Sequence, residues 1–479
     1  MPRAGTGTGG PVPGARGIFA AAPIVIAGVA IALANVGSTV VVARLLIPRE
    51  YGALTQLLGL FFILSMPGSA LMVGVVHRVT AWRIAGDEHR LKPWLGRVEM
   101  FCFGGLVLFM VTVWILQGRI ATWLSLPSRA GIFETLVAGA LWVIVSVNRG
   151  VLQARKEYHW LGWNLAIEGL TRTVFMIGLA AAGLGLTGAA MGILLGEALA
   201  LTHGMTGAFR GMTGVFRRSV DSSKWAASTF REPAAHLEQA GYPGHGHGHG
   251  HGRSTHGRRE LAGDVLTAFA SLGLLAILQY MDVVMVGAFS PSRAGDYGAI
   301  SVSAKSLVFW TIMLTNYLLP EATIRWHMGG HALGELRNTL VLALLPALLM
   351  LAIALTVPSL FLGAAFGSNL EGAASGFPYL VGAMAFLSVT IIFTNYFFGV
   401  AWRGIPAVLT VGAGALIGSI VAAGGRPLQT ARMDLVVQAC LAAVVVGCFV
   451  VLDRRQAHNQ AGLSKQPWRN GQYAESDVA

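Results

Sequence analysis

One short sequence occurs twice in the chain and decides its fold. Pro48-Arg49-Glu50-Tyr51-Gly52-Ala53 lies between the first and second hydrophobic runs, and Pro291-Ser292-Arg293-Ala294-Gly295-Asp296-Tyr297-Gly298-Ala299 lies between the seventh and eighth. In each copy a proline precedes an acidic residue followed by Tyr-Gly-Ala. A second echo joins Gly150-Val151, after the fourth run, to Gly399-Val400, after the tenth. Two echoes at nearly matching offsets indicate two repeats of six runs each.

The composition indicates an integral membrane protein. Of the 479 residues, 54% are apolar and only 12% are charged, whereas a soluble domain has about 25% charged residues. The mean hydropathy of +0.63 and the 62 glycines agree, since glycine is more frequent in membrane helices than in soluble ones. A soluble enzyme of several domains is excluded. The basic excess falls between hydrophobic runs, so it indicates topology rather than a nucleic-acid-binding patch.

The hydrophobic runs are long enough to cross a bilayer as helices, which takes about 20 apolar residues. The first run is too long for a signal peptide and has no convincing cleavage site. The sequence therefore predicts an all-α polytopic membrane protein of about twelve transmembrane helices. The predicted spans are 18–46, 52–76, 98–118, 131–151, 161–182, 187–208, 262–289, 296–319, 338–365, 375–400, 404–424 and 433–452.

Orientation follows from the positions of Lys and Arg between the spans. Most of them lie in segments that are inside if the N-terminus is inside, as in the loop after the second span, which holds Arg78, Arg83, Arg90, Lys92 and Arg97. We therefore expect both termini to be cytoplasmic.

A polar, His- and Gly-rich stretch, residues 209–261, divides the runs into six before and six after. Such a composition cannot bury a core and predicts a flexible cytoplasmic linker. The expected organisation is a cytoplasmic N-terminus (1–17), an N-terminal six-helix lobe (18–208), this linker, a C-terminal six-helix lobe (262–453) and a cytoplasmic polar tail (454–479). Because six is even, the repeat is parallel, which predicts two helical bundles around a central cavity that opens alternately to each side.

Four stretches resemble one transporter family. Residues 43–52 are similar to its turn after the first helix, 149–155 to its junction between helices four and five, 167–172 to its fifth helix, and 280–287 to part of its seventh. The chain resembles the polysaccharide transporter branch of the multidrug/oligosaccharidyl-lipid/polysaccharide exporter superfamily. The resemblance covers most of residues 18–452 but not the His-rich linker or the tail.

The resemblance implies a flippase for an undecaprenyl-type lipid-linked oligosaccharide in a bacterial inner membrane, in polysaccharide biosynthesis, with a polymerase or glycosyltransferases as further partners. Two alternatives stay open: a drug or cation antiporter of the same superfamily, and a non-transporting scaffold of a polysaccharide synthase complex. The major facilitator superfamily also has six plus six spans, but Gly86-Asp87-Glu88-His89-Arg90 does not match its Gly-x-x-x-Asp-Arg type loop motif.

Ionisable residues inside spans are expensive and are therefore candidate site residues. Lys305 and Arg172 are the candidate cavity cations, which would attract an anionic headgroup such as a diphosphate. Glu168 lies four residues before Arg172, so a salt bridge within one helix is the competing interpretation. For Lys305, with Ser301 one turn earlier on the same face, the competing interpretation is a structural pair with Glu168 or Glu197.

Glu197 and Asp282 complete the candidate cavity residues. Glu197 could carry a proton, or could be a neutral carboxyl packed among small residues. Asp282 could contact substrate, or could cap a helix or face the outer interface. Pro67 and Gly68, in the middle of the second span, predict a kink that could serve as a hinge.

The alternating histidines of the linker, His245, His247, His249 and His251, could gather around a transition metal. No span interior shows metal-ligand spacing, so a low-complexity linker is the favoured interpretation and no cofactor is expected. The three cysteines give neither a disulfide framework nor a metal pattern. No catalytic constellation or phosphate-binding glycine loop is present, so we expect a transporter rather than an enzyme.

Overall fold

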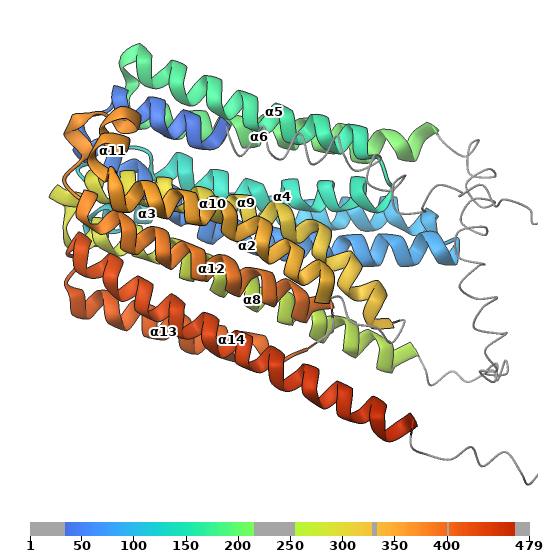
Figure 1. Cartoon of the computed structure of the whole chain (residues 1–479). Helices are drawn as coiled ribbons and strands as arrows, with labels where there is room; N and C mark the ends of the chain where they lie inside the picture. The colour runs from blue at the N-terminus through green and yellow to red at the C-terminus, as the bar shows by residue number, and fades with distance from the viewer. Residues whose placement is uncertain (1–33, 215–253, 328–332, 400–401, 465–479) are drawn as a thin grey trace, which may run out of the picture.

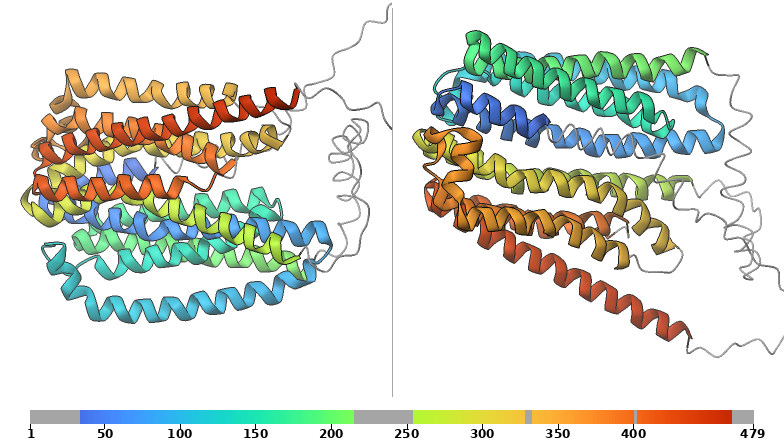
Figure 2. Two further views of the ribbon diagram at one scale, coloured as in Figure 1. Left: turned by 90° about the horizontal axis from the view of Figure 1, so that it is seen from below. Right: turned by 45° about the horizontal axis from the view of Figure 1, so that its top comes forward.

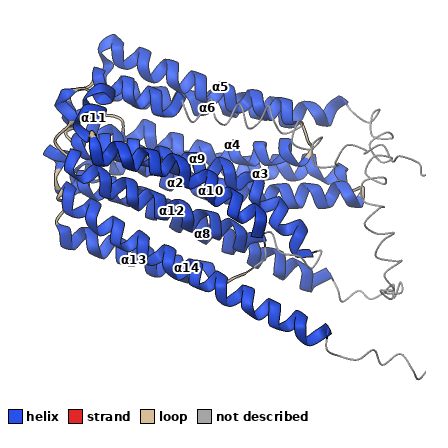
Figure 3. Cartoon of the chain, in the orientation of Figure 1, coloured by secondary structure: helices blue, strands red, loops and turns tan. Residues whose placement is uncertain are grey.

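A computed structural model describes residues 34–214, 254–327, 333–399 and 402–464, and within these ranges the secondary structure is helical throughout, with no strand (Figure 3). Ten helical stretches are long and apolar enough to cross a membrane. One of them, Tyr158–Arg210, contains two helices. Of the predicted first span, residues 34–45 are described and are helical. The predicted class, an all-α polytopic membrane protein built from two bundles, is confirmed.

The helices follow the predicted spans in order. The N-terminal half contains α2 (Pro48–Ala85), α3 (Leu91–Trp123), α4 (Ile132–Ala154), α5 (Tyr158–Leu179) and α6 (Gly185–Gly214). The C-terminal half contains α8 (Ser254–Phe289), α9 (Ala294–His327), α10 (Leu333–Thr356), α11 (Pro358–Phe366), α12 (Phe377–Gly399), α13 (Ile405–Ala423) and α14 (Pro427–Ser464). Short helical turns cover Glu88–Arg90, Ala180–Leu184, Pro291–Arg293, Ser368–Leu370 and Ala374–Gly376.

Several helices run past the predicted boundaries, and one predicted span is divided. The span predicted at 338–365 is two helices, because Val357 precedes a proline and takes a non-helical conformation between α10 and α11. Helix α8 begins at Ser254, inside the predicted flexible linker, and α14 continues to Ser464, inside the predicted polar tail. Hydropathy finds only the apolar part of a helix, so polar turns that continue the helix beyond the membrane escape it.

The helices form two groups that follow the order of the chain. Figure 2 shows the N-terminal helices, blue to green, lying together apart from the C-terminal helices, yellow to red. Helix α2 joins the groups, because it packs against α4 in its own lobe and against α8 and α9 in the other. We call the end of the molecule that carries α11 the turn end, and the opposite end, where α6 ends and α8 begins, the linker end (Figure 1).

The two copies of the repeated sequence meet at the turn end. A Cβ atom on Gly52 would lie 2.6 Å from the backbone nitrogen of Gly295, and one on Gly298 would lie 2.5 Å from Oγ1 of Thr55. Glycine therefore lets the two lobes approach backbone to backbone. The motif tyrosines, Tyr51 and Tyr297, are fully buried. The repeat that identified the two halves in the sequence is thus also their contact.

Hydrogen bonds cross between the lobes near the same end. The amide nitrogen of Gln56 donates to the carbonyl oxygen of Val284 in the C-terminal lobe and to that of Leu124 in its own lobe, at 3.0 Å each. The guanidinium of Arg44 donates to the carbonyl oxygens of Ala364 and Ala365, the latter at 2.9 Å. These carbonyls belong to the last turn of α11, the end of a helix at which the helix dipole favours a positive charge.

Helices α5 and α6 form a tight antiparallel pair in the N-terminal lobe. The chain reverses through Gly183 and Gly185, whose φ angles of 91° and 52° suit glycine. Along the pair, a Cβ atom on Gly192 would lie 2.2 Å from the backbone nitrogen of Met176, and one on Gly196 would lie 2.7 Å from Cβ of Arg172. The small residues of α6 thus bring the backbone of α5, with Arg172, directly against it.

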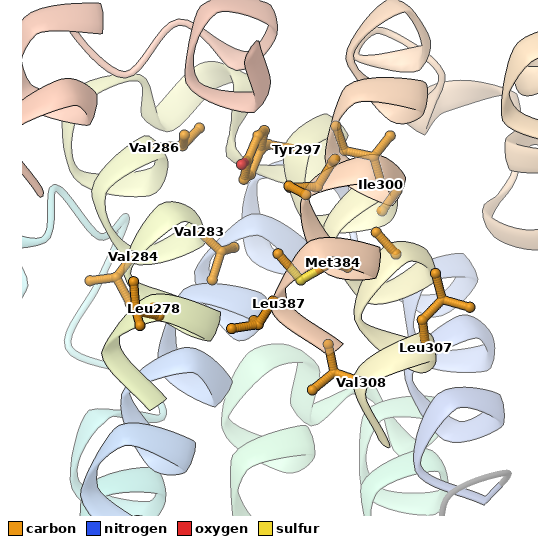
Figure 4. Close-up of a cluster of buried hydrophobic side chains, with 14 of the residues drawn as sticks. Leu278, Val283, Val284, Val286, Tyr297, Ile300, Leu307, Val308, Met384 and Leu387 are labelled. Carbon is orange, nitrogen blue, oxygen red and sulfur yellow. The ribbon is translucent and has the colours of Figure 1, made fainter. Parts of the chain in front are cut away.

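The core of the C-terminal lobe is a set of large apolar side chains from α8, α9 and α12. Figure 4 shows Val283 and Leu278 of α8, Tyr297 of α9, and Met384 and Leu387 of α12 gathered in one buried cluster. This cluster fixes α8 against α9, and so fixes the relative positions of the polar residues that the two helices carry.

Candidate functional site: a cavity between the lobes

A cavity of about 70 Å³ lies between the two lobes. Its walls come from residues 34–45, α2 and α5 on one side and from α8 and α9 on the other. Two charged residues line it, Arg172 from the N-terminal lobe and Lys305 from the C-terminal lobe, and none of the lining residues in the described part of the chain is acidic. The structure therefore brings the two predicted cations to one cavity.

Lys305 is held by a carboxylate on the neighbouring helix. Its Nζ atom lies 2.7 Å from Oδ1 of Asp282 on α8 and 2.6 Å from Oγ of Ser301 on its own helix. The contact with Ser301 fits the predicted polar face. The competing interpretation, a structural pair with an acid such as Glu168 or Glu197, names the wrong acids: both glutamates belong to the other lobe's network, and Asp282 is the partner of Lys305.

Asp282 is fully buried rather than placed at an outer interface, which corrects that interpretation. The hydroxyl of Tyr297 donates to its Oδ2 atom at 3.0 Å, so Asp282 links the repeated turn sequence to the cavity lysine. A second carboxylate, Asp434 on α14, is buried nearby, with its Oδ1 accepting from Nε2 of Gln438 at 3.2 Å. The Oδ2 atom of Asp434 has no hydrogen-bond partner among the described residues.

Arg172 belongs to a buried network in the N-terminal lobe. Its guanidinium pairs with Glu168 one turn earlier, as the competing interpretation proposed, and its Nη1 atom lies 3.8 Å from Oε1 of Glu197. Glu168 also binds Nη2 of Arg149, on α4, at 2.5 Å. Neither carboxylate oxygen of Glu197 accepts a hydrogen bond from a described residue, although Glu197 is fully buried.

Arg149 is a site residue that sequence reasoning missed. Its Nε atom donates to Oδ1 of Asn164 at 2.7 Å, and Nδ2 of Asn164 donates to the carbonyl oxygen of Ala200 at 2.6 Å. These hydrogen bonds join α4, α5 and α6. A signal was present, because Arg149 falls inside the predicted span 131–151, and Asn164 and Glu168 are four positions apart on one helix face.

The two lobes therefore carry similar arrangements. Each presents one cation to the cavity, holds it with a buried carboxylate, and contains a second buried carboxylate on its last helix, Glu197 on α6 and Asp434 on α14. Because the holding carboxylates are buried behind the cations, an entering ligand meets the positive groups first. Such a cavity suits an anion better than a cation.

The predicted hinge residues lie inside a continuous helix. Pro67 falls within α2, which runs from Pro48 to Ala85. A Cβ atom on Gly68 would lie 2.9 Å from Oγ of Ser146 and from the ring of Trp142. Close packing of α2 on α4 thus accounts for the glycine, and the hinge stays a prediction.

The predicted metal-binding histidines, His245, His247, His249 and His251, lie outside the described residues. Within the described ranges no group of three or more His, Cys, Asp or Glu side chains is placed to hold a metal ion. The histidine run keeps its status as a hypothesis.

The geometry defines a class: a polytopic membrane protein of two helical bundles with a cavity between them that is lined by Arg172 and Lys305. No family model matches the chain, and no curated protein sequence matches it. Solved structures do, and the fold is that of transporters of the multidrug/oligosaccharidyl-lipid/polysaccharide (MOP) superfamily.

Three of these structures cover most of the chain. The inward-facing conformation of a multidrug resistance MATE family transporter of the MOP superfamily aligns with 90% of this chain and 99% of its own, with a TM-score of 0.59 and 13% identity. A MOP superfamily transporter from Pyrococcus furiosus is described as having a binding pocket of reverse polarity that suggests a different function. It aligns with 91% of this chain and 95% of its own, with a TM-score of 0.57 and 14% identity. The lipid II flippase MurJ in an inward closed conformation aligns with 88% of this chain and 86% of its own, with a TM-score of 0.54 and 9% identity. At these identities the likeness concerns the fold.

Proposed function

We propose that the chain is an alternating-access transporter that flips an amphiphilic anion, a lipid-linked oligosaccharide with a diphosphate headgroup, across a bacterial inner membrane. The observation that carries the proposal is the pairing of Arg172 and Lys305, from opposite lobes, on one cavity whose described lining has no acid. A diphosphate has enough charge to bind both cations at once. When the lobes part, the cations part, and the headgroup is released.

The fold supports the proposal from a second side. A similar fold is found in a lipid II flippase and in a multidrug resistance MATE family transporter. The cavity of about 70 Å³ is too small for such a ligand, so this conformation precedes or follows the loaded state. The lobes must separate further for substrate to enter. By the distribution of Lys and Arg, the linker end and both termini face the cytoplasm, where a lipid-linked precursor and its glycosyltransferases would be found.

A drug or cation antiporter of the same superfamily is the second candidate. The buried carboxylates Glu197 and Asp434, each with an oxygen that has no described partner, favour it, since an antiporter needs acids that can exchange a cation or proton. Against it stands the position of both acids behind the cations rather than on the cavity surface.

A deletion strain and reconstituted vesicles together test the proposal. We expect the strain to lose surface polysaccharide and to keep its resistance to cationic dyes. Vesicles with purified protein should flip a fluorescent lipid-linked diphosphate saccharide and should not move a cationic dye. A strain with normal polysaccharide and lost dye resistance would favour the antiporter. Lost polysaccharide with no flipping in vesicles would favour the scaffold of a synthase complex.

A further inference from the structure

An aromatic cluster forms the cavity wall beside Lys305. Phe62 of α2, Tyr280 of α8 and Phe309 of α9 all line the cavity. The rings of Phe62 and Tyr280 are stacked across the interface between the lobes, with centroids 4.7 Å apart and an angle of 13° between the ring planes. Phe309 packs against Phe62 with centroids 5.7 Å apart. The cavity therefore has a cationic part and an aromatic part that touch.

Tyr280 is the residue where the two parts meet. The Nζ atom of Lys305 lies over its ring, 5.2 Å from the centroid, in the range of a cation–π contact. Its hydroxyl accepts a hydrogen bond from Nε2 of Gln279 at 3.0 Å, which fixes the ring on the C-terminal lobe. Phe62 belongs to the other lobe. When the lobes separate at this point, Tyr280 stays beside Lys305 and loses its aromatic neighbour.

A ring face next to a cation fits one particular chemistry. A pyranose ring presents several C–H groups on one face, and these pack on the electron-rich face of an aromatic ring. In a diphosphate-linked saccharide the first sugar is joined to the phosphate through a single oxygen. A phosphate bound at Lys305 therefore places that sugar at the adjoining ring of Tyr280.

We propose that Tyr280 is the platform for the sugar attached to the diphosphate, and that Phe62 covers this platform in the empty transporter. The proposal rests on the proposed function, because it takes the anion at Lys305 to be a saccharide diphosphate. It adds a specificity-determining residue: the transporter distinguishes a sugar-bearing lipid from the bare carrier lipid through Tyr280. Phe62 and the sugar compete for one ring face, so exchange between them accompanies separation of the lobes.

The test compares two ligands that differ only in the sugar. The full chain, purified in lipid nanodiscs, is titrated with undecaprenyl diphosphate and with the same lipid carrying one hexose. We expect the wild-type protein to bind the hexose-bearing lipid about tenfold more tightly, which corresponds to about 1.4 kcal/mol. Tyr280→Leu should abolish this ratio, so that the variant binds the two lipids equally. Tyr280→Phe should preserve the ratio, since the ring remains.

Two further variants sharpen the result. Phe62→Leu removes the competing ring and should raise the ratio, because Tyr280 is then open to the sugar. Tyr396→Leu is the matched control: Tyr396 is a tyrosine of the same lobe with the same 5% exposure as Tyr280, but it lies outside the cavity lining. This control should leave the ratio as in the wild type.

The outcomes separate the two proposals. A wild-type protein that binds both lipids equally overturns the sugar platform and leaves the flippase proposal standing. A Tyr280→Leu variant that loses affinity for both lipids alike, or for neither, also overturns the platform, because the residue would then act only in packing or not at all. A wild-type protein that binds neither lipid overturns the proposed function and the platform with it.

Discussion

The ammonium group of Lys305 lies 2.7 Å from a carboxylate oxygen of Asp282, on the preceding membrane helix. Both side chains are almost completely buried, with exposed side-chain fractions of 4% and 0%. Buried pairs of this kind add little net stability, but the loss of one partner leaves an uncompensated charge in the interior. The pair therefore makes Lys305 available to the cavity at no large cost to the fold.

The first prediction concerns the cost of breaking this pair. Lys305→Met leaves Asp282 buried without its cation, and it should lower the amount of folded protein in the membrane, since a lost partner costs about 3–5 kcal/mol. Lys305→Met combined with Asp282→Asn should restore the amount, because no charge remains. Quantitative immunoblotting of membranes measures both. A single variant with wild-type abundance would show that Asp282 does not depend on Lys305.

The second prediction concerns Arg149 in the N-terminal lobe. Arg149→Met removes the bonds to Glu168 and Asn164 and leaves Glu168 with Arg172 as its remaining cation. We expect a fall in the thermal unfolding midpoint of several degrees, followed by fluorescence in detergent. Arg49→Met, at an exposed position of the turn end, serves as the control and should leave the midpoint in place. Equal midpoints for the two variants would contradict the assigned role of Arg149.

The third prediction concerns the contact between the repeated turns. Gly52→Ala places a methyl group against the backbone of Gly295, and overpacking of this kind costs about 1–3 kcal/mol. Because the strain falls between the lobes, it should favour the conformation in which the turn end is open. The rate at which a thiol reagent labels a cysteine placed at Thr55 reports this opening.

The control for that prediction is a glycine with open space around it. A methyl group on Gly104 of α3 would meet no atom within 4 Å. In the protein that carries the Thr55→Cys substitution, Gly104→Ala should leave the rate of thiol labelling unchanged. If Gly52→Ala labels no faster than Gly104→Ala, the glycine contact does not govern opening of the turn end.

The architecture could be predicted well because it depends on local sequence patterns. Apolar runs locate the spans, and the repeated Tyr51 and Tyr297 turns identify two halves. Of the site, the pair Glu168 and Arg172 could be predicted because four residues separate them on one helix. The polar face of Ser301 and Lys305 followed for the same reason.

The remaining site contacts could not be predicted, because they depend on how helices pack. Asp282 and Lys305 are 23 positions apart on different helices, so no helical spacing relates them. Asp434 lies on the last span and is buried, and its neighbour Gln438 reaches α8 by donating to the carbonyl oxygen of Leu278 at 3.0 Å, a contact between distant parts of the chain. The aromatic stack of Phe62 and Tyr280 joins the two lobes, and periodicity within either lobe contains no information about it.

The fourth prediction concerns the linker. Residues 233–250 lie outside the described part of the chain and precede α8, which begins at Ser254. If this segment is only a tether, its deletion should leave membrane abundance and transport unchanged, and zinc or nickel should have no effect on either protein. A deletion that abolishes transport while abundance stays normal would indicate a role for the linker beyond connection.

The most direct test of the central claim, that the cavity cations bind the headgroup of an anionic lipid, is the rate of flipping in vesicles by charge-balanced variants. Lys305→Met with Asp282→Asn should reach the membrane normally and should flip a fluorescent lipid-linked diphosphate saccharide at less than about a tenth of the wild-type rate, the loss expected for about 1.4 kcal/mol or more of lost attraction. Lys305→Arg should retain part of the rate, because it keeps the charge. A charge-balanced double variant that flips this lipid at the wild-type rate would contradict the account.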